Sequence, residues 1–280
     1  KPFFHIQHPH PRDTVHGAVW GQDDAESVKA LSKYPNAVSF SGHSHTSLVD
    51  EKSVWQGAFT AFGTATLRDV GSSGLASGVE AGFENAKTPA GKGALDALKV
   101  MGQYDRFETK QGQFVRVYAD RLVVSRRDFV SDLALTDDLV MPLPAAERKP
   151  FAFETRAASA KPPKFASGAA LAFAQTEAKR RGAKKKDAAV KCVEIVLPPA
   201  DAEPSARGVR YVITATGADG KKLEVAFLHN AYRFAKDDRR THAPAKCRIA
   251  LDRLPSGEVT FEVRAYSCWD KASEPLVGKF

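Results

Sequence analysis

The segment AVSFSGHSH, residues 37–45, joins an apolar run to two histidines and decides the first part of the fold. The run over 37–41 predicts a buried strand. His43 and His45 follow it two residues apart, a spacing that puts side chains on the same side of an extended chain. Imidazole is the commonest protein ligand for transition metals, so the segment predicts a metal site at the end of a strand.

A second histidine cluster, FFHIQHPHP at residues 3–11, predicts another short strand that runs into a proline-stiffened loop. Between the two clusters, residues 24–32 predict a helix, because Val28, Ala30 and Leu31 supply a short apolar face and Tyr34-Pro35 ends it. Strand, helix and strand form the crossover of a layered α/β domain, which gathers its ligands at strand ends. We therefore expect the two clusters to meet, and six of the eight histidines lie within the first 45 residues.

Residues 1–70 resemble the C-terminal half of the catalytic domain of a calcineurin-like metallophosphoesterase, in its bacterial branch. In that family one strand ends in a ligand histidine and the next ends in Gly-His-x-His. Three stretches carry the resemblance, at residues 4–17, 31–45 and 50–65. The resemblance covers about a quarter of the chain closely.

The resemblance implies a hydrolase that cleaves phosphate mono- or diesters at a dinuclear site holding manganese, iron or zinc. It implies that His8 and His43 ligate one ion and that His45 ligates the other. His10 and His16 would then face the substrate side, beside the ligands or the phosphate. Two divalent ions create a hydroxide nucleophile near neutral pH and neutralise charge on the leaving oxygen. The sequence does not specify which phosphate ester is cleaved, because rim loops set that choice.

The remaining ligand motifs of that family, Asp-x-His, Gly-Asp-x-x-Asp and Gly-Asn-His-Asp/Glu, do not occur in the sequence. We therefore expect this chain to be the C-terminal part of the enzyme, inactive alone, with the N-terminal half of the catalytic domain as its partner. We expect no signal region within this chain and expect the parent protein to be extracytoplasmic, either periplasmic or secreted. The alternative is a non-catalytic binding or adhesion protein built on a degenerate phosphoesterase scaffold.

Length and composition limit the other classes of function. A chain of 280 residues with 43% apolar and 26% charged residues can bury one or two cores, and two domains are favoured. No run reaches the roughly 18 to 20 apolar residues of a membrane helix, so no membrane span is expected. The net charge of +8 is concentrated only at residues 179–186. No aromatic residues interleave there, so we expect a solvated helix end or loop and no nucleic-acid partner.

Three cysteines, Cys192, Cys247 and Cys268, all lie in the C-terminal part. None belongs to a Cys-x-x-Cys pair of the kind that binds zinc. An exported protein could join two of them in a disulfide, but the odd third cysteine leaves the pairing open.

The rest of the chain divides into segments that differ in composition and in the secondary structure that they predict. Strands expected at 53–62, 64–67, 113–118 and 121–127 complete an α/β layered metallophosphoesterase half-domain over residues 1–128. Within it, the Gly- and Ser-rich stretch at 71–93 predicts a surface loop. Residues 129–164 are proline-rich and predict an extended linker.

Residues 165–280 predict an all-β sandwich domain. Short β-rich runs separated by turn signals occur at 192–197, 208–216, 222–227, 245–251 and 258–266. Asp219-Gly220 is a hairpin turn signal, and residues 251–266 resemble the end of a fibronectin type III sandwich. Because such a sandwich can fold alone, we expect residues 165–280 to be stable by themselves. Residues 1–128 alone should instead aggregate through an uncovered sheet edge.

Overall fold

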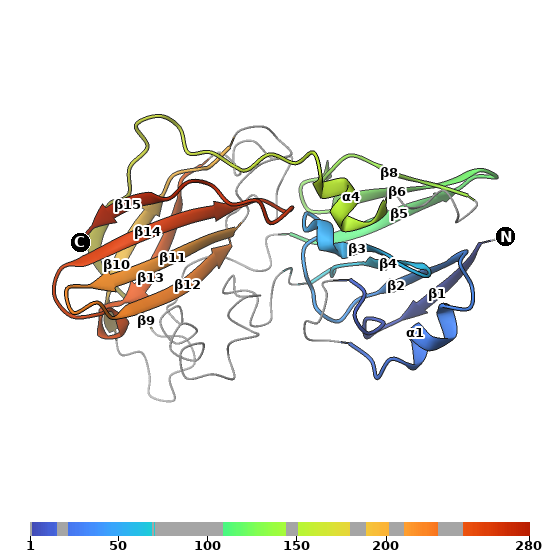
Figure 1. Cartoon of the computed structure of the whole chain (residues 1–280), viewed down its shortest axis with the longest axis horizontal. Coiled ribbons are helices and arrows are strands. Elements are labelled where there is room, and N and C mark those ends of the chain that lie inside the picture. The colour runs from blue at the N-terminus through green and yellow to red at the C-terminus, as the bar shows by residue number, and fades with distance from the viewer. Residues whose placement is uncertain are drawn as a thin grey trace. The chain divides into compact units, whose positions relative to one another are not determined.

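The computed structural model describes residues 2–15, 22–68, 70, 109–143, 151–179, 189–201, 210–228 and 243–280. These residues are mostly β, forming one small mixed sheet, three antiparallel sheets and a few short helices (Figure 1). They divide into two compact units. Unit 1 takes its described residues from Lys1–Ser73 and Arg106–Ala160, and unit 2 takes them from Lys161–Ala231 and Asp238–Phe280.

Unit 1 begins with a four-stranded mixed sheet in the order β1-β2-β4-β3. The strands are β1 (Phe3–Gln7), β2 (Ala37–Ser41), β3 (Val54–Gln56) and β4 (Thr60–Gly63). Helix α1 (Glu26–Leu31) connects β1 to β2, which pair in parallel, and β2 pairs in parallel with β4. The predicted strand-helix-strand crossover is therefore confirmed, and the carboxyl ends of three strands lie at one edge.

The second sheet of unit 1 is antiparallel, with β6 paired to β5, β7 and β8. The strands are β5 (Gln111–Val117), β6 (Arg121–Asp128), β7 (Leu133–Ala134) and β8 (Leu139–Pro142), and the short helices are η1 (Glu51–Ser53) and α4 (Phe153–Ala157). The two sheets share one core, in which Val38 and Phe62 of the mixed sheet pack with Leu122 and Val124 of β6.

Several sequence expectations for unit 1 need correction. The expected linker over 129–164 contains β7, β8 and α4, because Met141 and Phe151 are buried in the shared core. The strand expected at 53–62 is broken into β3 and β4, which pair as an antiparallel hairpin, and 64–67 is not a strand. Helix α1 has only six residues, so the described part of unit 1 is less helical than the predicted α/β layers.

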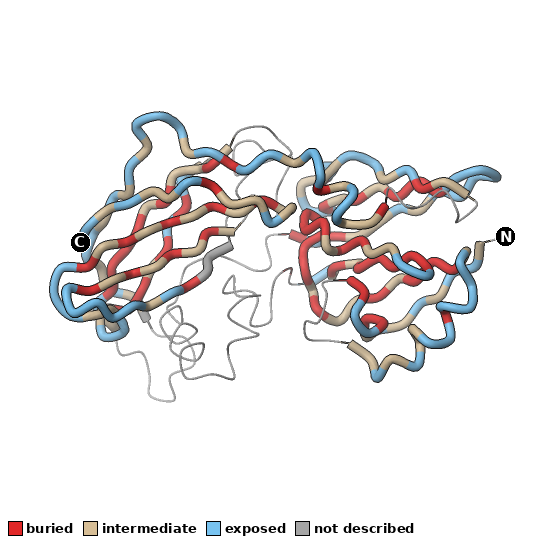
Figure 2. Tube along the Cα trace, in the orientation of Figure 1, coloured by how far each residue is buried: buried red, intermediate tan, exposed pale blue. Residues whose placement is uncertain are grey.

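Unit 2 contains two antiparallel sheets, one ordered β13-β10-β9 and the other β12-β11-β14-β15. Its elements are β9 (Ala172–Lys179), β10 (Ala189–Leu197), β11 (Arg210–Gly217), β12 (Lys222–Leu228), β13 (Ala245–Ala250), η7 (Leu251–Arg253), β14 (Val259–Tyr266) and β15 (Leu276–Lys279). Buried residues alternate with less buried ones along the central strands (Figure 2). The inward side chains of both sheets form a single core cluster, so the two sheets pack face to face.

All five strands predicted for this region are present, whereas β9 and β15 were not predicted. β9 is rich in alanine and polar residues, and β15 is only four residues long, so neither has a strong apolar alternation. They belong to the sheets because Phe173 of β9 packs on Phe261 and also lies against Gly278 of β15.

Three further sequence expectations concern the cysteines, a membrane span, and segments that the structure does not describe. Within the described structure no disulfide joins Cys192, Cys247 or Cys268, and the first two are buried. Within the described ranges, no helix is long and apolar enough to cross a membrane. The predicted loop at 71–93, nearly all of the basic run at 179–186, and His16 lie outside the described residues.

Candidate metal centre

The candidate site lies at the carboxyl ends of β1, β2 and β4. His8 follows β1 and His43 follows β2. The backbone N–H of Gly42 donates to the carbonyl of His8 at 3.1 Å, and the N–H of Thr64 donates to the carbonyl of Ser41 at 2.8 Å. These bonds continue the lateral pairing beyond the strands and hold the three chain segments side by side.

His8 and His43 meet directly, as the sequence predicts. The Nδ1 atom of His43 lies 2.8 Å from Nε2 of His8, and the rings meet edge to face with centroids 4.6 Å apart. The 2.8 Å spacing is that of a hydrogen bond between the rings. Two imidazole nitrogens bound to one tetrahedral zinc ion at 2.0–2.1 Å lie about 3.3 Å apart. The two rings would therefore have to separate by about 0.5 Å to ligate a single ion, and both side chains are at least partly exposed to solvent.

His43 is electrostatically suited to bind a cation. Partial burial, followed by the positive charges of His8 and His45, lowers the pKa of His43 below its ordinary value. The imidazole is then neutral around pH 7, and a neutral ring is the form that ligates metals. Because the charge of His45 contributes to this lowering of the pKa, His45 lies near His43.

The backbone of the Gly-His-Ser-His turn is strained. His43 has a φ of 64° and His45 a φ of 55°, both in the left-handed region that few non-glycine residues occupy. Such conformations cost about 1–3 kcal/mol each and are concentrated at functional sites. The turn therefore holds its two imidazoles in an arrangement that an unconstrained chain would avoid.

The structure brings together two of the three predicted ligands. Among the residues that the structure describes, no group of three or more His, Cys, Asp or Glu side chains converges on one point. His45 interacts with His43 through charge, but it is not part of such a group.

His10 lies behind this pair, buried in the protein. Its Nδ1 is 2.7 Å from the hydroxyl of Ser41, and its Nε2 is 2.8 Å from the hydroxyl of Ser44. The Ser44 hydroxyl also accepts hydrogen bonds from the N–H and the hydroxyl of Thr46. His10 thus ties the loop after β1 to the His43-Ser44-His45 turn, and its burial places it away from a substrate in solvent.

Unit 1 should lose stability in acid through His10. Burial, then the charges of His43 and His8, lowers the pKa of His10 to about 4. The unfolded chain, with an ordinary pKa near 6.5, binds this proton more readily, so stability should fall as the pH drops from about 6.5 to about 4. The loss from this one group should be roughly 3 kcal/mol.

Urea unfolding of the metal-free protein at several pH values measures this loss. In His10→Gln, which has no titratable ring, the slope of stability against pH between 4 and 6.5 should be clearly shallower. Equal slopes in the two proteins would exclude His10 as the source.

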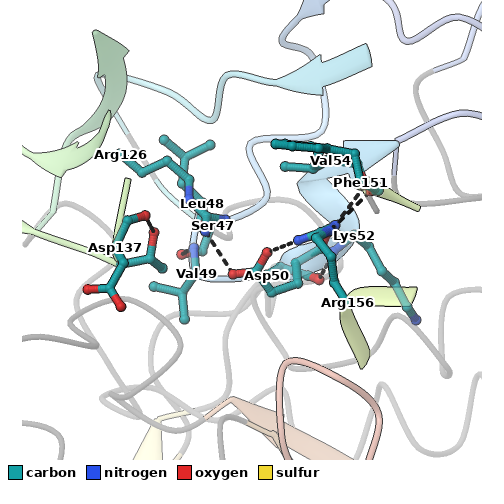
Figure 3. A network of polar contacts seen from close by, with 12 residues as sticks. Ser47, Leu48, Val49, Asp50, Lys52, Val54, Arg126, Asp137, Phe151 and Arg156 are labelled. Atoms are coloured by element: carbon teal, nitrogen blue, oxygen red, sulfur yellow. Dashed lines mark hydrogen bonds and ion pairs between the residues drawn. The ribbon is translucent and has the colours of Figure 1, made fainter. Parts of the chain in front are cut away.

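A buried ion network that the sequence analysis missed supports the segment after the turn (Figure 3). Arg126 of β6 donates to a Glu51 carboxylate oxygen at 2.7 Å and to the Leu48 carbonyl at 3.0 Å. Arg156 of α4 pairs with the other Glu51 oxygen and donates to the Val54 carbonyl at 3.2 Å. The network therefore fixes residues 48–54 against both β6 and α4.

Two further polar contacts hold the same segment. The Gln111 side-chain carbonyl accepts from the Ser47 hydroxyl at 3.1 Å and from the Leu48 N–H at 2.8 Å. The sequence did carry one signal of the network. Leu122, Val124 and Arg126 alternate along β6, which places the arginine on the face that packs into the core.

No family model, curated protein or solved structure matches this chain.

Proposed function

We propose that unit 1 binds a divalent transition metal at His8 and His43 and belongs to a metal-dependent phosphoesterase. The observation that carries the proposal is the 2.8 Å approach of their ring nitrogens at the carboxyl ends of two parallel strands. The depressed pKa of His43 and the strained turn that holds it support a ligand role. The likeness of residues 1–70 to calcineurin-like metallophosphoesterases supplies the reaction class.

In this proposal each residue has a distinct part. His8 and His43 offer neutral nitrogens to the cation, and His45 extends the site toward a second ion. His10 holds the turn in place through Ser41 and Ser44. A bound divalent metal would activate water and draw charge from the phosphate oxygens. Carboxylate and amide ligands from the family's other motifs would complete a dinuclear site, so we expect this chain alone to bind metal without efficient turnover.

The fold of unit 2 supports the fibronectin type III part of the prediction. Its three-stranded and four-stranded sheets share one core, and Tyr211 is fully buried with its hydroxyl donating to the Pro198 carbonyl at 3.0 Å. Two antiparallel sheets packed around one core are typical of that class of sandwich. We propose that unit 2 is a fibronectin-like accessory domain.

Calorimetric titration of the full chain with Mn²⁺ and Zn²⁺ tests the metal site. His8→Ala and His43→Ala should each weaken binding at least tenfold. His5→Ala is the matched control, because His5 lies on β1 and bonds to Ser39 at 3.1 Å instead of reaching the site. Its affinity should equal that of the wild-type protein. Unchanged affinity in both site variants would leave the non-catalytic binding protein as the better function.

A further inference from the structure

An open apolar groove of about 720 Å³ lies between the two sheets of unit 1. Ligand sites in proteins measure roughly 300–1,000 Å³ and are mostly apolar with a few polar groups. The groove matches this description. Its lining includes Ile6, Phe40, Thr64, Leu67, Val115 and Phe129.

The walls of the groove expose large apolar side chains. Ile6 of β1 is 80% exposed and Leu67 is 65% exposed, while Phe129 on the opposite wall is 41% exposed. Phe40 and Val115 also pack against the core shared by the two sheets, so the groove continues that core outward. An apolar ligand lying in it would remove this surface from water, which favours binding.

One end of the groove borders the histidine pair. Thr64 lines the groove, and a Cβ atom at Gly42 would lie 3.8 Å from its Oγ1 and 3.7 Å from Nδ1 of His8. His8 and the groove are thus separated by about the width of one residue. Ile6, two residues before His8, lies on the wall of the groove, so the path from metal site to groove follows β1.

We propose that this groove binds the hydrocarbon chain of a long-chain alkyl phosphate, with the phosphate held at the cation that His8 and His43 would ligate. The inference rests on the proposed function and adds the substrate class to it. Hydrolysis would consume one water molecule: its oxygen forms a new bond to phosphorus, the bond from phosphorus to the alcohol oxygen breaks, and the alcohol leaves with a proton. The groove would take the alcohol's chain, because its walls are apolar and it begins beside the pair.

Isothermal titration of the full chain with hexyl and decyl phosphate, in the presence of Mn²⁺ and below the micelle concentrations, tests this inference. Complete burial strengthens binding about fourfold per methylene group. We expect decyl phosphate to bind at least tenfold more tightly than hexyl phosphate. Ile6→Asn and Leu67→Asn, at exposed positions that should not affect folding, should each reduce this ratio at least threefold. Val277→Asn, at a 57% exposed valine of β15, should leave the ratio unchanged.

The outcomes separate the groove from the metal site. Equal affinities for the two phosphates would overturn the inference, and metal binding that still depends on His43 would leave the proposed function standing. A second outcome is that decyl phosphate still binds more tightly than hexyl phosphate, but that neither affinity changes when Mn²⁺ is omitted or His43 is replaced. That outcome would overturn both the placement of the phosphate and the proposed function. Sedimentation supplies a third outcome. If Ile6→Asn dissociates a dimer and the ratio does not change, the groove is an interface between copies of this chain and the inference fails.

Discussion

Replacing Glu51 with leucine should destabilise unit 1 by about 3–5 kcal/mol, because it leaves the buried Arg126 and the partly buried Arg156 without their shared carboxylate. Arg126 is nearly inaccessible to solvent, and its Nε already has no hydrogen-bond partner within the described structure. Loss of Glu51 would also remove the acceptor at 2.7 Å from its terminal nitrogen. A buried unpaired charge is among the most costly defects in a protein core.

Hydrogen exchange followed by mass spectrometry can measure this effect in each unit separately. Peptides from β2 and β6 should lose protection in Glu51→Leu, whereas peptides from β11 and β14 should keep it. The matched control is Asp138→Asn, which breaks the exposed ion pair between Arg116 and Asp138 and should cost less than about 1 kcal/mol. A similar small loss in both variants would show that the buried network contributes little.

Replacing Phe261 with alanine should destabilise unit 2 by about 3–5 kcal/mol. Phe261 of β14 is fully buried, and its ring lies 5.2 Å from that of Phe173 in the facing sheet. Truncation to alanine would leave a cavity between the two sheets, and the surrounding strands can close only part of it. Since both sheets depend on this core, the whole unit should lose stability together.

Urea unfolding of a chain of residues 161–280 measures this loss. The wild-type sequence should unfold in one cooperative transition, as expected for a sandwich with its own core. Phe261→Ala should move the midpoint to lower urea, and Val277→Ala, at an exposed position on β15, should change stability by less than about 0.5 kcal/mol. A wild-type chain of residues 161–280 that remains unfolded would contradict the prediction that this part folds independently.

The parts of the candidate site that depend on local sequence patterns could be predicted. The run over 37–41 and the histidines after it placed His43 at a strand end, and FFHIQHPHP did the same for His8. The helix between them implies parallel pairing of the two strands, which brings both ends to one edge of the sheet. The contact between His8 and His43 follows from that geometry. His45 is placed by the turn, whose left-handed backbone the simple two-residue spacing does not anticipate.

The sequence by itself determined the elements that carry a strong short-range period. These are the crossover from β1 to β2, the hairpin of β5 and β6, and five strands of unit 2. It could not determine which polar side chains turn inward and find partners. The sequence predicts His10 on the substrate side, beside the ligands or the phosphate, but it does not predict that the packing of its loop turns His10 onto Ser41 and Ser44.

Only the tertiary structure paired Arg126 with Glu51, which is 75 residues away in sequence. Alternation along a strand determines which face a residue occupies, but it contains no information about what lies opposite that face. The opposite surface depends on sheet register and on how two sheets pack, and both follow from the sum of many weak, long-range contacts. The same reason explains why the stretch at 129–164 was mispredicted as a linker. Its prolines suggest an extended chain, but Met141 and Phe151 are buried in the core through long-range contacts.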